Sequence, residues 1–106
     1  MSILAYAAQH LAAGNPLGAL NLVAGLESPH ARALRGIALA QLREYERARI
    51  DLRAAIGGLE RAGDHADAAR AAAALAEVEL SSRNLTRARA ALERQERALF
   101  ERLDSQ

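Results

Sequence analysis

The chain has 106 residues, a formal net charge of +1 and no cysteine. The missing cysteines exclude disulfides, thiol catalysis and cysteine-based zinc sites, and the near-zero charge gives no overall field that would draw nucleic acid or a membrane surface. Hydrophobic residues make up 51% of the chain, aromatic residues only 3%, and alanine about a quarter. Because alanine is the best helix former and permits close helix contacts, the composition predicts a single all-α domain over residues 1–106.

Two further features bear on where the protein is found. No apolar run approaches the ~20 residues needed to span a membrane, and no basic segment precedes the first apolar residues, Ile3 and Leu4, as it would in a signal peptide. We therefore expect a cytoplasmic protein with no membrane partner. All 14 basic residues are arginine, which we interpret as the codon usage of a GC-rich bacterial genome.

Helix start and stop residues recur along the chain. Asn15 and Ser28 each precede a proline, the pattern of an N-cap followed by the first helical residue. Gly63-Asp64 ends one helix and begins the next, and Ser81–Asn84 is the last polar break, with Asn84 as the expected cap. These signals predict six helices, at residues 2–13, 16–27, 29–43, 45–61, 65–81 and 85–103.

Small and apolar residues recur at a regular spacing where the third and fourth of these helices meet. In order they are Gly36, Leu39, Leu42, Tyr45, Ala48, Leu52 and Ala55. The spacing resembles that of the tetratricopeptide repeat, a helix–turn–helix unit of about 34 residues. The same pattern can be laid on the other two helix pairs, through Ala7, Pro16, Ala19 and Val23, and through Ala76, Leu85, Ala88 and Leu92. The resemblance implies three hairpins, at residues 1–28, 29–62 and 65–103, stacked as a short right-handed superhelix; a plain helical bundle is the alternative.

In that family the first helix of each hairpin lines a concave groove. The resemblance therefore implies a partner-binding groove, lined by Leu4, Ala8, Leu11, His30, Leu34, Ile37, Gln41, Ala73 and Glu77. Most of these residues are apolar, which favours a helix or an extended segment of another protein as the ligand. Two interpretations stay open for Leu34 and Ile37, which either line an open groove or are buried between repeats.

No residue pattern predicts catalysis, a metal or a cofactor. His10, His30 and His65 are far apart in the sequence and lack the i, i+4 spacing of a helical zinc site. We interpret all three as capping or half-buried surface residues without a carboxylate cluster beside them. Gly57-Gly58 follows no expected strand and forms no phosphate-binding loop, so we expect it to loosen or bend its helix.

Charged residues of both signs are mixed along the expected helices. Arginines and carboxylates recur at helical spacing, as in Arg47 with Asp51, Arg89 with Glu93, and Glu93 with Arg97. Such solvated pairs contribute about 0.3 kcal/mol each. A stripe for nucleic acid would lack the interspersed carboxylates and would carry aromatic residues for base stacking. The charge pattern therefore predicts no nucleic-acid partner.

The last expected helix carries an apolar stripe of Leu85, Leu92, Leu99, Phe100 and Leu103. Its first part is expected to pack on the preceding helix, through Ala72, Leu75 and Ala76. The last two turns reach beyond that helix, although repeat arrays normally end with a polar outer face. We therefore expect Leu99, Phe100 and Leu103 to be covered by a second copy in a homodimer, by another partner, or by further repeats of a longer chain.

Taken together, these features predict a non-enzymatic protein–protein interaction module, an adaptor or chaperone-like domain that binds another protein in its apolar groove. The alternative is the sensor or oligomerisation segment of a larger bacterial transcription regulator. The spacing of about 40 residues between the second and third repeats, from Gly36 to Ala76, favours that alternative because the usual repeat is shorter.

Overall fold

The computed structural model describes residues 2–105, and the regular structure of this part is helical, with no strand. Its five helices are α1 (Ile3–Ala12), α2 (Pro16–Val23), α3 (Pro29–Gln41), α4 (Tyr45–Arg61) and α5 (His65–Asp104). The predicted all-α class is therefore confirmed. Within the described residues, no helix combines the length and the apolar character that crossing a membrane requires.

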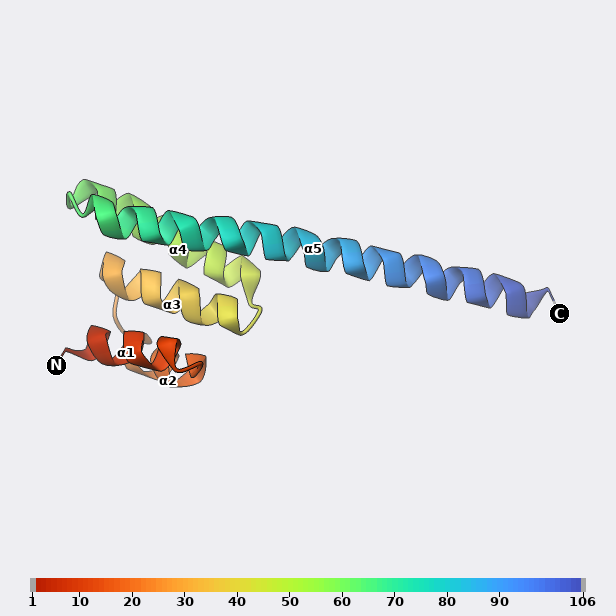
Figure 1. Ribbon diagram of the computed structural model, residues 1–106, viewed down its shortest axis with the longest axis horizontal. Helices are drawn as coiled ribbons and strands as arrows, with labels where there is room; N and C mark the ends of the chain where they lie inside the picture. Colours follow the sequence, from red (N-terminus) through yellow and green to blue (C-terminus); the bar gives the residue numbers. More distant parts are fainter. Residues whose placement is uncertain (1, 106) are drawn as a thin grey trace.

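The helix α5 corrects the prediction of six helices. It runs unbroken for 40 residues, about 60 Å, through the Ser81–Asn84 segment where a break was expected (Figure 1). Serine and asparagine disfavour a helix by only about 0.5 kcal/mol per residue, and the segment holds no glycine or proline that would interrupt the ladder. The hydroxyl of Thr86 even donates to the Ser82 carbonyl at 3.0 Å inside the helix. The expected third hairpin, residues 65–103, is thus one continuous helix, and Asn84 caps nothing.

The helices form a stack that begins with α1 and α2 and ends with α4 and α5 (Figure 1). α1, α3 and α5 run in one direction, and α2 and α4 run in the other. α3 lies at the centre and contacts each of the other four helices. Its Leu39 belongs to the core shared with α4 and α5, whereas Ala31 and Ala38 belong to the core shared with α1 and α2.

Three of the connections between helices share one turn geometry. A residue with positive φ follows the helix in each: Gly14 (75°), Arg43 (62°) and Gly63 (81°). The next N–H then donates to a carbonyl five residues back, from Asn15 to His10 at 2.7 Å, from Glu44 to Leu39 at 2.9 Å and from Asp64 to Leu59 at 2.9 Å. This is the closing hydrogen bond of the Schellman motif, which satisfies carbonyls at a helix end.

The N-caps predicted at Asn15 and Ser28 are confirmed. The Asn15 Oδ1 accepts from the Gly18 N–H at 3.1 Å, and the Ser28 Oγ accepts from the Ala31 N–H at 3.2 Å. Asp64 occupies the N-cap position of α5, but its side chain makes no capping hydrogen bond. Its carboxylate lies instead beside α3, where it takes part in the site described below.

Two glycines allow the helix pairs to approach closely. A Cβ on Gly36 of α3 would lie 2.7 Å from the Leu52 Cγ and 3.3 Å from the Ala48 carbonyl oxygen of α4. A Cβ on Gly58 of α4 would lie 2.6 Å from the Cγ of Pro29. Since α4 continues across Gly58 as a single helix, the structural role of this glycine is to admit the proline ring.

The small residues at the helix contacts behave differently in the three expected hairpins. Ala19 and Ala48 are fully buried, as close packing of α2 on α1 and of α4 on α3 requires. Ala88 is exposed, because no second helix folds back against the end of α5. The repeating pattern in the sequence therefore corresponds to two helix pairs followed by one long helix.

The second half of α5 extends well beyond the other helices (Figure 1). The chain measures 66 Å along its longest axis and has a radius of gyration of 18.3 Å, whereas a compact chain of this length would have about 13 Å. The buried residues of α5 are Ala68, Ala71 and Val78, all in its first half. Residues 85–104 are called the overhang from here on.

Candidate functional site

Two hollows lie along α3, on the side where it faces α5. The first, of about 210 Å³, is lined by Leu4 of α1, by His30, Leu34 and Ile37 of α3, and by Asp67 and Arg70 of α5. The second, of about 250 Å³, is lined by Ile37 and Gln41 of α3, Tyr45 of α4, and Ala74, Glu77 and Ser81 of α5. Ile37 lines both hollows, so they are neighbours along α3, and we call the two together the α3 groove.

The α3 groove brings together six of the nine residues expected to line a binding surface, namely Leu4, His30, Leu34, Ile37, Gln41 and Glu77. Of the others, Leu11 is buried in the core with α2, and Ala8 and Ala73 are exposed outside the two hollows. Leu34 and Ile37 are half-buried and line the groove. Each of them is therefore partly buried between helices and also lines the groove, which combines the two interpretations that the sequence left open.

Sequence reasoning missed Tyr45, Asp67 and Ser81 as groove residues. Tyr45 begins α4, and the resemblance to a repeat placed only first-helix residues in the groove. Ser81 was expected to belong to a break between helices. With α5 continuous, Ser81 becomes a wall of the second hollow. For Ser81 the missing signal was therefore the continuity of α5.

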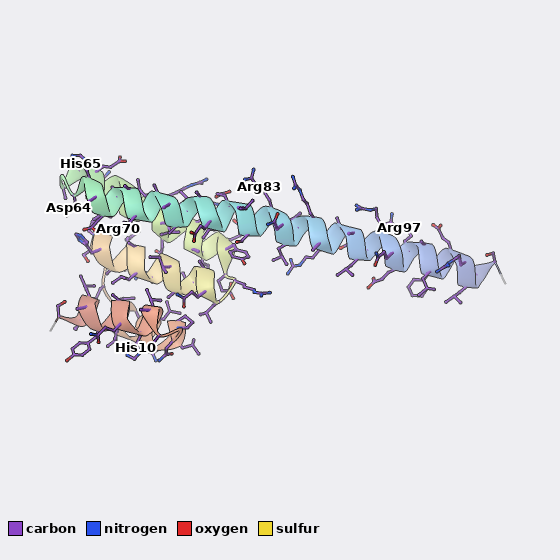
Figure 2. All side chains as sticks on the ribbon, in the orientation of Figure 1. His10, Asp64, His65, Arg70, Arg83 and Arg97 are labelled. Carbon is purple, nitrogen blue, oxygen red and sulfur yellow. The ribbon has the colours of Figure 1, made fainter. Side chains whose placement is uncertain are left out.

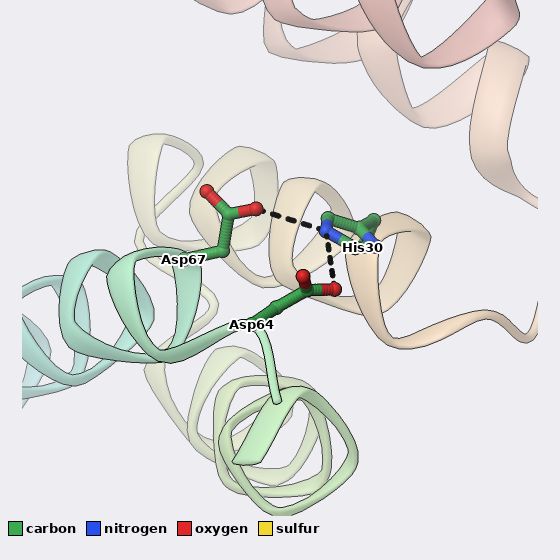
Figure 3. A group of neighbouring side chains, drawn as sticks. All are labelled: His30, Asp64 and Asp67. Atoms are coloured by element: carbon green, nitrogen blue, oxygen red, sulfur yellow. Dashed lines mark hydrogen bonds and ion pairs between the residues drawn. The ribbon is translucent and has the colours of Figure 1, made fainter. Parts of the chain in front are cut away.

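A histidine and two carboxylates meet at one end of the α3 groove (Figure 3). The Nε2 of His30, in the first turn of α3, lies 3.0 Å from the Asp67 Oδ2 and 3.6 Å from the Asp64 Oδ2. Arg70 Nη1 donates to the other oxygen of Asp67 at 2.6 Å. The hydrogen bond with His30, and then the one from Arg70, hold the pKa of Asp67 below its usual value. We call His30, Asp64 and Asp67 the His–Asp clamp.

The clamp corrects the interpretation of His30 as a residue without a carboxylate cluster. His30 and Asp67 are 37 positions apart, so no local spacing could reveal their contact. The clamp ties the start of α3 to the start of α5 and so fixes the width of the groove at this end.

A metal ion is the other occupant to consider for the clamp. The three side chains offer ligand atoms that lie within 4.8 Å of one another. However, one oxygen of Asp67 already accepts from Arg70. The cluster also lies where α3 and α5 begin, and helix N-termini carry partial positive charge that favours anions over cations. The clamp is therefore best described as a structural contact between two helices.

Arg35 of α3 joins its helix to α4 and to the segment that precedes α3. The Nε and Nη2 of Arg35 donate to the two carboxylate oxygens of Asp51 at 3.0 and 3.2 Å, and its Nη1 donates to the Leu26 carbonyl at 3.0 Å. The side chains of Arg35 and Asp51 are only 14% and 13% exposed, and the hydrogen bonds to Asp51 raise the pKa of Arg35. Asp51 thus pairs with Arg35 across helices, and the predicted pairing with Arg47 is wrong.

Arg49 makes the corresponding connection between α4 and α5. It donates to both carboxylate oxygens of Glu79, through Nε and, at 3.3 Å, through Nη2. These hydrogen bonds lower the pKa of Glu79. They hold α5 against α4, so that ion pairs as well as apolar contacts position the helices that form the groove.

The expected apolar stripe near the C-terminus lies on the overhang. Leu99, Phe100 and Leu103 are 48%, 68% and 56% exposed, and Leu92 is 58% exposed. The expected packing of this stripe on Ala72, Leu75 and Ala76 is wrong, because both sets of residues belong to the single helix α5. Figure 2 shows Arg83 and Arg97 on the side of α5 that faces away from the other helices.

Comparisons of the chain with protein-family models, with curated proteins and with solved structures found no match. The class of the protein is therefore defined by its own features: an all-helical chain with an apolar groove along α3 and an exposed apolar helix end.

Proposed function

We propose that this protein is a non-enzymatic interaction module, whose α3 groove binds a helix or an extended segment of another protein. The observation that carries the proposal is the pair of hollows that meet at Ile37 and run along α3 from His30 to Gln41. That distance is about 17 Å along a helix, enough for about three turns of a partner helix. An adaptor or chaperone-like module of the bacterial cytoplasm would act in this way by binding alone, without a metal or a cofactor.

The chemistry of the α3 groove supports this kind of ligand. Its middle is formed by apolar residues, including Ala33, Ile37 and Ala74, and its two ends are polar. Apolar grooves with polar ends suit an amphipathic segment, since the apolar side chains supply binding energy and the polar groups fix orientation. The two helix pairs and the close contact at Gly36 support the interpretation of the chain as a relative of the tetratricopeptide repeats.

A second candidate function is oligomerisation within a larger transcription regulator. The feature that favours it is the overhang, which projects an apolar surface away from the rest of the chain. In that case the groove would sense a ligand and the overhang would hold copies together.

A selection of helical and extended peptides from a display library tests the groove. The expected result is a set of peptides that bind the wild type and bind Ala74→Arg at least tenfold more weakly, because the arginine side chain would fill the second hollow. Ala72→Arg is the matched control, since Ala72 lies on the same helix but is exposed outside both hollows, and its binding should equal that of the wild type. Equal binding to both variants, or the absence of any selected peptide, would overturn the proposal.

A further inference from the structure

One face of α5 carries both its buried residues and its exposed apolar residues. Along this face the positions recur with alternating steps of three and four, which is the heptad spacing of a helix that packs along a single seam. The positions are Ala68, Ala71, Leu75, Val78, Ser82, Leu85, Arg89, Leu92, Glu96, Leu99 and Leu103. The first four pack in the core with α4. The overhang therefore continues the buried face of α5 into solvent, in register and without a partner in its own chain.

The exposed part of the seam is long. From Leu85 to Leu103 it extends over about 27 Å of helix, and Leu92, Leu99 and Leu103 are each about half exposed or more. Phe100, at the edge of the seam, is 68% exposed. Several large apolar side chains exposed along one helix face mark a site of association in soluble proteins.

We propose that the overhang pairs with the overhang of a second copy, antiparallel, to form a two-stranded coiled coil. The two charged residues of the seam, Arg89 and Glu96, favour a second copy as the partner and an antiparallel direction of pairing. In a parallel pair Arg89 would face the partner's Arg89 and Glu96 would face the partner's Glu96, so like charges would meet. In an antiparallel pair each Arg89 lies one layer from the partner's Glu96, and opposite charges meet twice.

Both charges are free to make this contact. The ion pairs of the described residues all lie between Glu27 and Glu79, so the expected pairs of Glu93 with Arg89 and Arg97 do not form. An opposite charge from a second copy is thus the partner that Arg89 and Glu96 lack in their own chain. The pair would be screened by salt, and its main effect is on the direction of pairing.

The base of the overhang shows where the partner helix ends. Placing Leu85 opposite the partner's Leu103 puts Leu92 opposite the partner's Glu96, and Arg89 opposite the partner's Leu99. The partner's Leu103 then lies beside a hollow of about 270 Å³ whose lining includes Tyr45 and Leu85 together with two arginines and two glutamates, Arg43, Arg89, Glu44 and Glu46. This hollow can receive the partner's Leu103.

Sedimentation of the full chain over a range of concentrations tests the pairing. The wild type is expected to shift from a mass of 11.3 kDa toward twice that value in the micromolar range, because an interface of this size lies at the small end of specific interfaces. Arg89→Glu should weaken dimerisation at least tenfold, and the double variant Arg89→Glu, Glu96→Arg should restore it. Arg87→Glu makes the same charge change outside the seam and should leave dimerisation unchanged. A wild type that stays at 11.3 kDa at every concentration would overturn the proposal.

Thiol cross-linking tests the direction, and the chain offers a background without cysteine. Antiparallel pairing brings Gln95 next to the partner's Gln95 across the two-fold axis, whereas Ala88 lies next to the partner's Arg102. A short cross-linker should therefore link two copies of Gln95→Cys. It should leave Ala88→Cys alone and Arg102→Cys alone as monomers. In a mixture of Ala88→Cys and Arg102→Cys it should link one copy of each. Self-cross-linking of Ala88→Cys with none at Gln95→Cys would show that the helices do not pair in this direction. Unchanged helicity by circular dichroism would show that each variant is folded.

Discussion

The closeness of α3 and α4 can be tested by adding one methyl group at chosen glycines. Gly36→Ala places a Cβ 2.7 Å from the Leu52 Cγ and 3.3 Å from the Ala48 carbonyl oxygen, distances at which the helices must move apart. Gly57→Ala is the matched control within the same helix pair. Its Cβ would meet only the Nη1 of Arg61, at 3.3 Å, and the end of an arginine side chain can move aside.

Gly36→Ala should be the less stable of the two variants. Alanine in place of glycine inside a helix stabilises by about 1 kcal/mol, and this gain applies to both. Overpacking at Gly36 costs about 1–3 kcal/mol, because Leu52 is fully buried and cannot turn into solvent. Gly57→Ala should therefore stabilise by about 1 kcal/mol. Gly36→Ala should be less stable than Gly57→Ala by about 1–3 kcal/mol, since the helix-propensity gain cancels between them.

Urea unfolding followed by circular dichroism measures this difference. Both variants should be compared at one protein concentration, because association would stabilise the folded chain by mass action. Gly58→Ala adds a second close contact to the series, since its Cβ would lie 2.6 Å from the Pro29 ring, and it should behave as Gly36→Ala does. Equal unfolding midpoints for Gly36→Ala and Gly57→Ala would show that α3 and α4 are further apart than the structure places them.

Two other predictions concern the turn after α3 and the His–Asp clamp. Arg43→Gly should stabilise the chain by about 1 kcal/mol, because Arg43 has a φ of 62° that glycine adopts without strain. Thermal unfolding measures the change, and a midpoint below that of the wild type would contradict the prediction. Asp67→Asn should destabilise the chain at neutral pH, because the lowered pKa of Asp67 means that its ionised form stabilises the fold. That contribution is complete above the usual value of 3.8 and is lost as the pH falls through the lower folded value. The difference between the urea midpoints of variant and wild type should therefore shrink as the pH is lowered below 3.8, and a difference that does not shrink would contradict the assignment.

The parts of the fold that could be predicted are those encoded by local residue chemistry. The Asn15 and Ser28 caps, each followed by a proline, placed the starts of α2 and α3 at the residues where the structure has them. Gly63 marked the end of α4, because glycine adopts its φ of 81° without the strain that a side chain adds. Such signals act within one helical turn and need no knowledge of the remaining chain.

The prediction failed at Ser81–Asn84 because residues that resemble a break are also tolerated inside a helix. Their small propensity costs are outweighed when the hydrogen-bond ladder continues on both sides. The repeat pattern itself misled here, since Leu85 and Leu92 occupy the spacing of a hairpin yet belong to a heptad seam. Apolar residues at helical spacing identify a face of a helix and do not say which helix covers it.

Contacts between distant residues were the other part that could not be predicted. The pairing of Arg35 with Asp51 spans 16 positions and that of His30 with Asp67 spans 37. Each depends on the distance between two helix axes, which is set by small residues such as Gly36 and Ala48. The sequence identified these small residues, and the ion pairs could be located only once the helices were placed.

The two surfaces proposed for binding meet at Tyr45. Its side chain lines the second hollow of the α3 groove and also the hollow at the base of the overhang. Because α5 forms a wall of both, as one unbroken helix, a ligand that turns the Tyr45 ring changes the space left for the partner's helix end. Groove binding and dimerisation are therefore expected to influence each other through this residue, and by thermodynamic linkage each must change the other by the same factor. The continuous α5 places both of the surfaces proposed for binding on one helix.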